Sequence, residues 1–394
     1  MKKKILSTAN FLIILILLLF FSACGTPDLE LPVEYPQDAY AIDSLTGSDN
    51  GSYELDEEEL AEVVERIEKG RYGNIHSLVI IHNDSLVLEE YFREWTRHML
   101  HPCYSVTKSF TSALIGIAIE QGYINGVDDK LLGFFTEYDD IENLDQRKKS
   151  ITLEHVLTMS SGFEWDEISV PYVDRQGNPN YENDVIELSQ SSDWIKHMLD
   201  VPMNFDPGSE FVYNSGGTHL LSGILTHTTG QSAEDFAEGN LFKALGITDW
   251  EWESDPNGIT VTGWGLSLHP VNMAMLGYLY LKNGRLNGQQ IVPEDWVEES
   301  TAKHTVIDNF VWIMNGKMDY GYQWWRFNDS MFDTMWRGDP PKVNDLFNAS
   351  GFGGQYIYIV PHLDMVVVIT AWEPTKMQYP AILFNDVYNT VKEK

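Results

Sequence analysis

A serine and a lysine stand three residues apart in the segment "CYSVTKSFTSALIGIAIEQG" (residues 103–122), where an apolar helical pattern begins. A serine hydroxyl becomes a nucleophile only when a base takes its proton, and a lysine serves when its amine is left neutral by burial or a nearby cation. Residues three apart share a helix face, and the first turn carries unpaired N–H groups and the positive dipole end, which favour a developing anion. Ser105 and Lys108 are therefore a candidate nucleophile and base.

The same spacing also occurs in ordinary helices, so its surroundings decide its meaning. Average residue usage gives on the order of one or two Ser-x-x-Lys patterns by chance in a chain of this length. A second one, Ser300 to Lys303, is present. We expect Ser300 to be a surface hydroxyl that closes a charged helix, whereas Ser105 opens an apolar one. On the local pattern alone, a serine N-cap followed by a surface lysine is the alternative at Ser105.

Two further stretches have the composition of substrate-contacting loops. "FDPGSEFVYNSGGTHLLSGIL" places Tyr213, Asn214 and Ser215 in a glycine-rich loop before another apolar helix. "FNASGFGGQYIYIVP" places small residues and glycines at the entry to a strand. Glycines there let the backbone approach a ligand closely, whereas a packed tyrosine and a β-bulge are the purely structural alternatives.

In this order, the three stretches resemble the motifs of the serine β-lactamase and penicillin-binding-protein superfamily. The resemblance is to its class C-related branch, which includes esterases, D-alanyl-D-alanine peptidases and hydrolases of 6-aminohexanoate oligomers. It covers roughly residues 60 to 390 and includes weaker phrases such as "ITLEHVLTMSSGFEW" and "NGQQIVPEDWV". It implies that Ser105 is acylated, that Lys108 is its proton partner, and that Tyr213 carries a proton to the leaving group.

The chain departs from the pattern of that superfamily at two motifs. Ser215 stands where the Tyr-x-Asn motif has asparagine. Ala349-Ser350-Gly351 stands where lactamases carry Lys-Thr-Gly, so the cation that would hold a substrate carboxylate is missing, and Gly353-Gly354 is the rival register. The positions that the resemblance then assigns to substrate binding or to the oxyanion hole are Ser215, Ser350, Gly351, Phe352 and Gly353.

In the first register, the oxyanion hole consists of the backbone N–H groups of Ser105 and Phe352. Tyr172, in "PYVDR", is expected to reach the substrate from a loop of the helical lobe.

The first 23 residues have the pattern of an export signal, because three lysines precede an apolar run that ends in small residues. Cys24 follows in "FSACG", which resembles the bacterial lipobox, with Phe21 where leucine is usual. The resemblance implies a lipid on Cys24 and a membrane-anchored, extracytoplasmic lipoprotein. A signal cut elsewhere, which gives a secreted or periplasmic protein, and an uncleaved anchor are the alternatives. Only Cys103 remains besides Cys24, so a lipidated Cys24 leaves no internal disulfide.

The composition favours a small-molecule partner. The 394 residues include 26 Lys and Arg against 59 Asp and Glu, a formal net charge of −33. Such a chain is repelled by nucleic acid and by anionic lipid heads. The 11 histidines form no His-Glu-x-x-His or His-x-His pair, so we expect no metal site. The sequence contains no Gly-x-Ser-x-Gly elbow, which argues against an α/β-hydrolase. We expect a cofactor-free enzyme that acts on an ester, amide or peptide, and the sequence does not specify an oligomeric state.

The elements that must position these residues follow from hydrophobic periodicity. An amphipathic helix begins near Asp56, and hairpins are expected at residues 76–92 and 355–372, followed by a helix from Ala381. The middle of the chain is mostly helical. This order predicts an α+β fold, with one antiparallel sheet from the N- and C-terminal strands, flanked by helices, and an inserted helical lobe. Active sites favour the seam between such parts.

We therefore expect a signal peptide (1–23), a lipidated N-terminus with a linker (24–56) and one serine hydrolase domain (57–394), whose helical lobe spans roughly 105–281. The function implied is an extracytoplasmic hydrolase that cleaves an ester or amide through an acyl-enzyme on Ser105. A β-lactamase or D-Ala-D-Ala carboxypeptidase of the same fold is one alternative. A penicillin-binding or sensor lipoprotein that does not turn over is another.

Overall fold

An eight-stranded antiparallel sheet, built from both ends of the chain, is the largest sheet of the protein. Its strand order is β3-β2-β14-β13-β12-β11-β10-β9. The strands are β2 (Ile75–His82), β3 (Ser85–Tyr91), β9 (Thr305–Asp308), β10 (Lys317–Tyr320), β11 (Trp325–Arg326), β12 (Phe347–Gly351), β13 (Gln355–Val360) and β14 (Met365–Ala371). The N-terminal β2 pairs with the C-terminal β14, so the predicted sheet from both chain ends and the α+β class are confirmed.

The computed structural model describes residues 40–47, 51–174, 178–308, 317–328, 345–376 and 378–394. The predicted signal peptide and Cys24 lie outside these residues. Within them, no helix combines the length and the apolar character needed to cross a membrane.

Both hairpins are where periodicity predicts them, but the sheet extends beyond them through β9 to β12. These additional strands are short, and β11 contains only two residues. A strand of that length shows no alternation of apolar and polar residues, which is why the sequence pattern does not reveal it.

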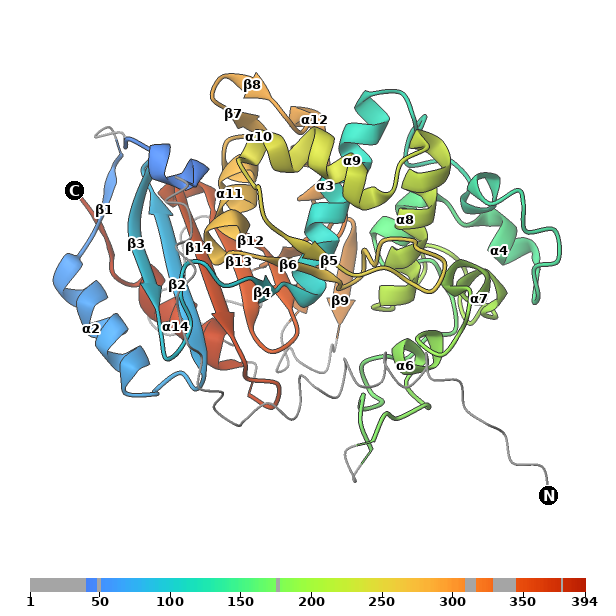
Figure 1. Ribbon diagram of the computed structural model, residues 1–394, viewed down its shortest axis with the longest axis horizontal. Helices are drawn as coiled ribbons and strands as arrows, with labels where there is room; N and C mark the ends of the chain where they lie inside the picture. The colour runs from blue at the N-terminus through green and yellow to red at the C-terminus, as the bar shows by residue number, and fades with distance from the viewer. Residues whose placement is uncertain (1–39, 48–50, 175–177, 309–316, 329–344, 377) are drawn as a thin grey trace. The chain divides into compact units, whose positions relative to one another are not determined.

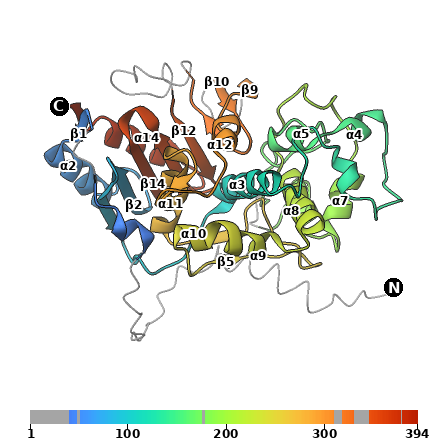
Figure 2. The same ribbon diagram turned by 90° about the horizontal axis from the view of Figure 1, so that it is seen from above.

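Helices cover both faces of this sheet (Figure 1). The helices α2 (Glu57–Glu68) and α14 (Gln378–Tyr388) pack together on one face, and α11 (Pro270–Leu281) packs on the other against β2, β13 and β14. Figure 2 shows α11 and α14 on opposite sides of β14. A Cβ at Gly277 of α11 would lie 2.6 Å from a methyl of Val366, so the helix approaches the sheet closely there. The helical lobe expected at 105–281 therefore ends before α11, which is buried on the sheet because it is apolar on almost every side.

The helical lobe is assembled around α3 (Thr107–Glu120) and α8 (Ser215–Thr229). Figure 2 shows α3 between the sheet and the helices α5, α7 and α8. The other elements of the middle of the chain are β4 (His101–Pro102), η2 (Tyr104–Val106), η3 (Leu131–Phe134), α4 (Gln146–Ser150), α5 (Leu153–Leu157), α6 (Asp184–Leu188), α7 (Trp194–Asp200), α9 (Ala233–Ala237), η4 (Glu238–Phe242), α10 (Lys243–Leu245), β5 (Glu251–Trp252) and β6 (Leu266–Leu268). After α11 follow β7 (Arg285–Leu286), β8 (Gln289–Gln290) and α12 (Glu294–Ser300), and η5 (Pro361–Leu363) joins β13 to β14.

Part of the expected linker packs on this body. The turn η1 (Ala41–Ser44) buries Ile42 completely, and β1 (Tyr53–Leu55) pairs with the C-terminal β15 (Val391–Glu393). Residues N-terminal to the expected domain start at 57 therefore also pack on this body. The apolar residues around Ile42 form a run too short to show a helical or strand period, so no periodicity marks it.

Two hydrophobic clusters meet near the predicted motifs. The larger one joins α3, α8 and α11 to one face of the sheet and contains Val106 and Ala349. The smaller one lies with α2 and α14 against the other face and contains Tyr213 and Trp325. The start of α3 and the loop before α8 thus lie where the two clusters adjoin.

Candidate active site

Ser105 lies in η2, a short 3₁₀ turn, two residues before α3 begins, and it is partly exposed. The preceding residue, Tyr104, has φ +46°, a left-handed conformation that is unusual for an aromatic residue. The backbone N–H groups at this end of α3 have no partner within the helix and carry the positive end of its dipole. Ser105 therefore occupies the helix N-terminus predicted for it.

Lys108 is directed at Ser105 from the first turn of α3. Its Nζ lies 3.1 Å from Ser105 Oγ, and it also donates to Ser215 Oγ at 2.9 Å and to the carbonyl of Gly263 at 2.6 Å. Only 1% of Lys108 is exposed. Burial lowers the pKa of Lys108 to about 8, although the negative charge of Glu167 opposes this shift. A lysine with this pKa has a neutral fraction large enough to act as a base near neutral pH.

Tyr213 contacts the same hydroxyl from the loop before α8. Its phenol is hydrogen-bonded to Ser105, and Lys108 Nζ lies 4.8 Å from the centre of its ring. Trp325 of β11 stacks on the Tyr213 ring, with 5.7 Å between the ring centres. Burial and the charge of Glu167 raise the pKa of Tyr213, so this phenol stays protonated. Of the two groups beside Ser105, the lysine is therefore suited to accept a proton and the tyrosine to donate one.

Ser215 stands at the first position of α8 and connects Lys108 to a buried carboxylate. Its Oγ donates to Glu167 Oε1 and its backbone N–H donates to Glu167 Oε2, both at 2.7 Å. The sequence analysis missed Glu167 and the carbonyl of Gly263. Glu167 is 48 residues from Ser215 and follows by two residues the family-like phrase that ends at Trp165, but nothing in that phrase marks it as a partner of Ser215. Every residue has a carbonyl, so no sequence signal marks the contact of Gly263.

The end of β12 lies against the backbone before Ser105. A Cβ at Gly351 would collide with the carbonyl oxygen of Cys103, which explains the need for glycine here. The ring of Phe352 contacts that of Tyr104 at 5.9 Å. The structure thus brings Gly351 and Phe352 to Ser105, as the first register predicts. Gly353, with φ +78°, instead forms the turn between β12 and β13.

Ala349 and Ser350 precede Gly351 on β12. Ser350 pairs with Tyr356 across the sheet and its hydroxyl is hydrogen-bonded to the Tyr356 phenol. Ala349 is completely buried in the larger cluster, whereas Tyr213 belongs to the smaller one.

Tyr172 lies near this group, across from β12. Its ring packs edge to face on that of Phe352, with 5.7 Å between the ring centres. The ring of Phe352 packs in the same way on that of Trp372, with 5.9 Å between the ring centres. Burial, with smaller effects from Glu167 and Tyr213, raises the pKa of Tyr172. With Tyr104, these residues form an aromatic wall (Tyr104, Tyr172, Phe352 and Trp372) beside the serine.

The second Ser-x-x-Lys pattern makes no comparable arrangement. Ser300 ends α12, as expected, but it is fully buried rather than a surface hydroxyl, and its Oγ lies 3.4 Å from the carbonyl of Val297. Helix α12 packs against α3. Lys303 pairs with Asp319 at 3.2 Å.

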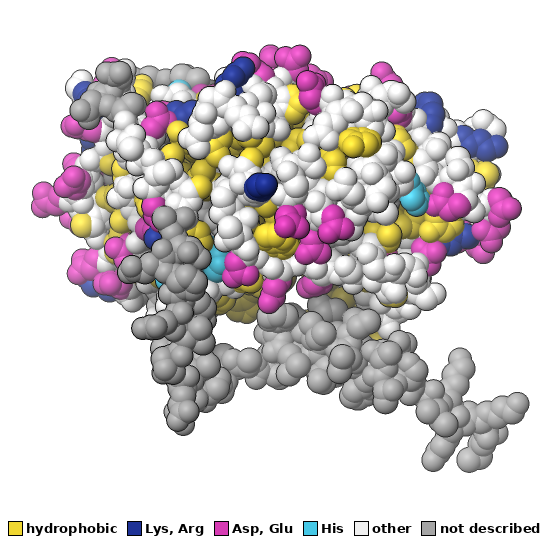
Figure 3. All heavy atoms as spheres, turned by 45° about the horizontal axis from the view of Figure 1, so that its top comes forward, with side chains coloured by type: hydrophobic (Ala, Val, Ile, Leu, Met, Phe, Trp, Pro, Cys, Tyr) yellow, Lys and Arg dark blue, Asp and Glu magenta, His cyan; other side chains and the backbone are white. Residues whose placement is uncertain are grey.

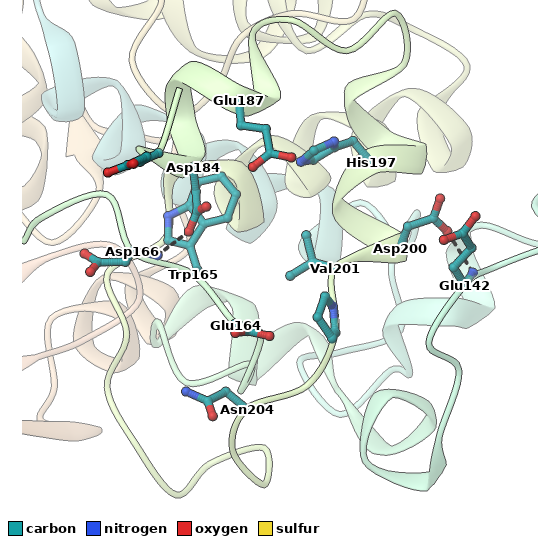
Figure 4. Close-up of a pocket in the computed structure, with 12 residues that line it drawn as sticks. Glu142, Glu164, Trp165, Asp166, Asp184, Glu187, His197, Asp200, Val201 and Asn204 are labelled. Atoms are coloured by element: carbon teal, nitrogen blue, oxygen red, sulfur yellow. Dashed lines mark hydrogen bonds between the residues drawn. The ribbon is translucent and has the colours of Figure 1, made fainter. Parts of the chain in front are cut away.

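A cavity of about 800 Å³ lies in the helical lobe beside Trp165, and Figure 4 shows the side chains that line it. Seven of them are acidic, namely Glu142, Glu164, Asp166, Glu182, Asp184, Glu187 and Asp200. In Figure 4 the imidazole of His197 and the carboxylate of Glu187 point toward one another. Among the described residues, His, Cys, Asp and Glu side chains form no group of three or more that could hold a metal ion. Figure 3 shows acidic side chains spread widely over one face, so a local excess of carboxylates is not special to the cavity.

The chain is similar to several known proteins. A family model described as Beta-lactamase matches residues 64–381. A 6-aminohexanoate-dimer hydrolase from Paenarthrobacter ureafaciens is 25% identical over 73% of this chain and 70% of its own length. An uncharacterized protein from Alkalihalophilus pseudofirmus is 26% identical over 56% of this chain, and the match spans 62% of that protein's length.

Solved structures show the same fold. A putative 6-aminohexanoate-dimer hydrolase from Bacillus anthracis has a TM-score of 0.64 and 22% identity, with 83% of this chain and 80% of that chain covered. A family VIII carboxylesterase has a TM-score of 0.61 and 14% identity, with 85% and 97% covered. At these identities the likeness concerns the fold alone.

Proposed function

Because this chain belongs to the Beta-lactamase family of serine β-lactamase-fold hydrolases, we propose that it cleaves an ester or amide through an acyl-enzyme on Ser105. One observation carries this proposal. The Ser105 hydroxyl lies between the amine of Lys108, 3.1 Å away, and the phenol of Tyr213, and both of these side chains are buried. A base with a lowered pKa and an acid with a raised pKa on the same hydroxyl are the two groups that acyl transfer requires.

The proposed reaction follows from these contacts. Neutral Lys108 takes the proton of Ser105 as Oγ attacks the substrate carbonyl. The backbone N–H groups of Ser105 and Phe352 stabilise the resulting oxyanion, at about 3 kcal/mol for each donor. Tyr213 protonates the leaving group and is reprotonated by Lys108, and a water molecule then releases the acid from Ser105.

The proposed substrate is neutral at the position where a β-lactam carries its carboxylate. The aligned position is Ala349, which is buried and uncharged, and the chain carries a net charge of −33. A charge-assisted hydrogen bond from a lysine to the carboxylate of a β-lactam contributes roughly 1.5 to 3 kcal/mol. Without this bond we expect kcat/KM for a β-lactam to be about 10- to 150-fold lower. The 6-aminohexanoate-dimer hydrolase among the similar proteins also favours an amide over a β-lactam or a D-Ala peptide.

Fluorophosphonate labelling with mass-spectrometric mapping tests the proposal. We expect the label on Ser105, and we expect Ser105→Ala to abolish both labelling and the hydrolysis of a p-nitrophenyl ester. Ser300→Ala is the matched control, because it removes a buried hydroxyl from the other Ser-x-x-Lys pattern and should leave both unchanged. Turnover retained by the Ser105 variant would contradict the mechanism, and a single burst of product without turnover would indicate a sensor protein instead.

The proposed location is outside the cytoplasm, on a membrane through a lipid at Cys24. It rests on the lipobox-like "FSACG", which lies outside the described residues. Two or more acyl chains hold a protein stably on a bilayer. Cys24→Ser should therefore move the protein from the membrane fraction to the soluble fraction, and an unchanged fractionation would contradict the anchor.

A further inference from the structure

Glu167 is a buried carboxylate with no role in the reaction described so far. Only 2% of it is exposed, and its two oxygens accept three hydrogen bonds of 2.7 Å, from Trp165 Nε1, Ser215 N and Ser215 Oγ. A buried charge is destabilising unless it is paired and hydrogen-bonded. The chain thus arranges two residues around a carboxylate whose nearest cation is the candidate base, Lys108.

The donors around Glu167 favour its ionised form. Burial raises the pKa of Glu167 above its usual value, and Lys108, the two Ser215 donors and Trp165 oppose this rise. The three hydrogen bonds of 2.7 Å, all arranged to be accepted by its two oxygens, match the ionised form. A carboxylate has no proton to donate, so the Ser215 hydroxyl must donate its single proton to Glu167 Oε1. Ser215 Oγ can then only accept a hydrogen bond from Lys108.

This direction fixes the orientation of the amine. The carbonyl of Gly263, the other buried partner of Lys108, also only accepts. A neutral amine has two N–H bonds and one lone pair. When Ser215 and Gly263 take the two N–H bonds, the lone pair is left for the third partner, Ser105 Oγ at 3.1 Å.

We propose that Glu167 is a positioning residue, which holds the Ser215 hydroxyl as an acceptor and so directs the lone pair of neutral Lys108 at Ser105. This inference rests on the function proposed above for Ser105 and Lys108. The hydrogen bonds of Glu167 go to Trp165 and Ser215 and occupy both of its oxygens, so it acts through Ser215.

Glu167 also affects the pKa of Lys108. Its negative charge raises the pKa of Lys108 against the effect of burial. Among the described residues, Tyr172, Tyr213 and Tyr320 also interact electrostatically with Glu167, and burial raises their pKa values, so they remain neutral. Removing the carboxylate charge should therefore lower the pKa of Lys108 further.

Glu167→Gln alters both the direction of the Ser215 hydrogen bond and the charge beside Lys108, and the two changes have different readouts: the first affects the rate and the second affects the pH midpoint. Its amide oxygen can still accept from Trp165 and Ser215 N, but its amide nitrogen then faces Ser215 Oγ and donates to it. The Ser215 hydroxyl can then donate its hydrogen bond to Lys108 Nζ, where it competes with the Ser105 hydroxyl for the lone pair of the amine. We expect the single-turnover acylation rate above pH 8 to fall about 10- to 100-fold, a part of what a positioned general base supplies. The midpoint of the acidic limb should move to lower pH.

Glu164→Gln is the matched control, since it removes the same charge from an exposed side chain three residues away. It should change neither the rate nor the midpoint. Equal losses in the two glutamine variants, or a folded Glu167→Gln with an unmoved midpoint, would overturn the inference.

Ser215→Ala tests the route through Ser215 and serves if Glu167→Gln does not fold. It removes the bridging hydroxyl and keeps the charge of Glu167, so the rate should fall while the midpoint stays in place. Adding Glu167→Gln to Ser215→Ala should cause no further loss of rate above pH 8, because the two variants remove one shared interaction. Fully additive losses would mean that Glu167 acts by another route.

The titration of Lys108 provides a readout that does not depend on turnover. In protein labelled with ¹⁵N-lysine, the Nζ signal that is absent from Lys108→Met identifies this residue. It should titrate at lower pH in Glu167→Gln than in the wild type, and an unchanged titration would contradict the inference. A wild type that fluorophosphonate does not label at Ser105 would contradict the proposed function instead, so the two failures are distinguishable.

Discussion

The helical lobe and the candidate site each contain a buried lysine, and the two differ in their partners. Lys108 on α3 and Lys148 on α4 are 1% and 0% exposed, and burial lowers the pKa of each to about 8. Lys148 donates only to the carbonyls of Glu142, at 2.9 Å, and Leu199, at 2.6 Å. Lys108 has one carbonyl and two hydroxyls as partners.

The comparison shows that burial and a lowered pKa do not by themselves make a lysine a catalytic base. Carbonyl oxygens have no proton to give, so neutralising Lys148 activates nothing, and its ammonium satisfies the unpaired Leu199 carbonyl near the end of α7. The Ser105 hydroxyl beside Lys108 does have a proton. The chemistry therefore depends on the partner, and Glu167 decides which of the two hydroxyls beside Lys108 donates to it.

Replacing each lysine by methionine gives the largest expected contrast. Lys108→Met keeps the apolar length of the side chain and removes the base, so acylation by a p-nitrophenyl ester should slow about 10²- to 10⁴-fold. Lys148→Met should acylate at the wild-type rate, because Lys148 is bonded only to carbonyls of the lobe. Stopped-flow detection of p-nitrophenol measures both variants. A comparable loss in Lys148→Met would show that a buried lysine acts on the rate through folding alone.

The pH dependence of acylation sharpens the same contrast. With its pKa at about 8, Lys108 is mostly protonated at pH 6, and its neutral fraction rises with pH. The rate should therefore increase about tenfold per pH unit below 8 and level off above it. Lys148→Met should keep this profile, although Lys148 has a similar pKa. A profile that is flat from pH 6 to 9 would exclude Lys108 as the base.

The sequence reveals those parts of the fold and site that have periodicity or a local motif. The two hairpins, α2 and α14 follow from apolar alternation and helical spacing, and the Ser105–Lys108 contact follows from a spacing of three. Tyr213, 108 residues from Ser105, was found because its motif resembles that of a known family.

The remaining contacts have no local signal. Glu167 meets Ser215 only because the loop after α5 folds across the start of α8, and one acidic residue among 59 carries no mark of burial. The partners of Lys148 are two backbone carbonyls, which any sequence supplies. The short strands β9 to β12 lack the length for a pattern, so the sheet beyond the hairpins emerges only from the tertiary structure.

The smallest expected effect is on the pH dependence of stability, where the two lysines should behave alike. In the unfolded chain a lysine has its ordinary pKa of 10.5, and in the folded protein the pKa of Lys148 is about 8. Between these values the unfolded state binds more protons, so the free energy of unfolding rises with pH through this window. The maximum slope for one group is about 1.4 kcal/mol per pH unit. Urea unfolding of the wild type, Lys148→Met and Lys108→Met at pH 8 and pH 9.5 measures this rise, and each variant should show a smaller one than the wild type. Equal rises in all three proteins would show that neither lysine is held neutral by burial, and the base proposed for Ser105 would then need its proton removed by some other group.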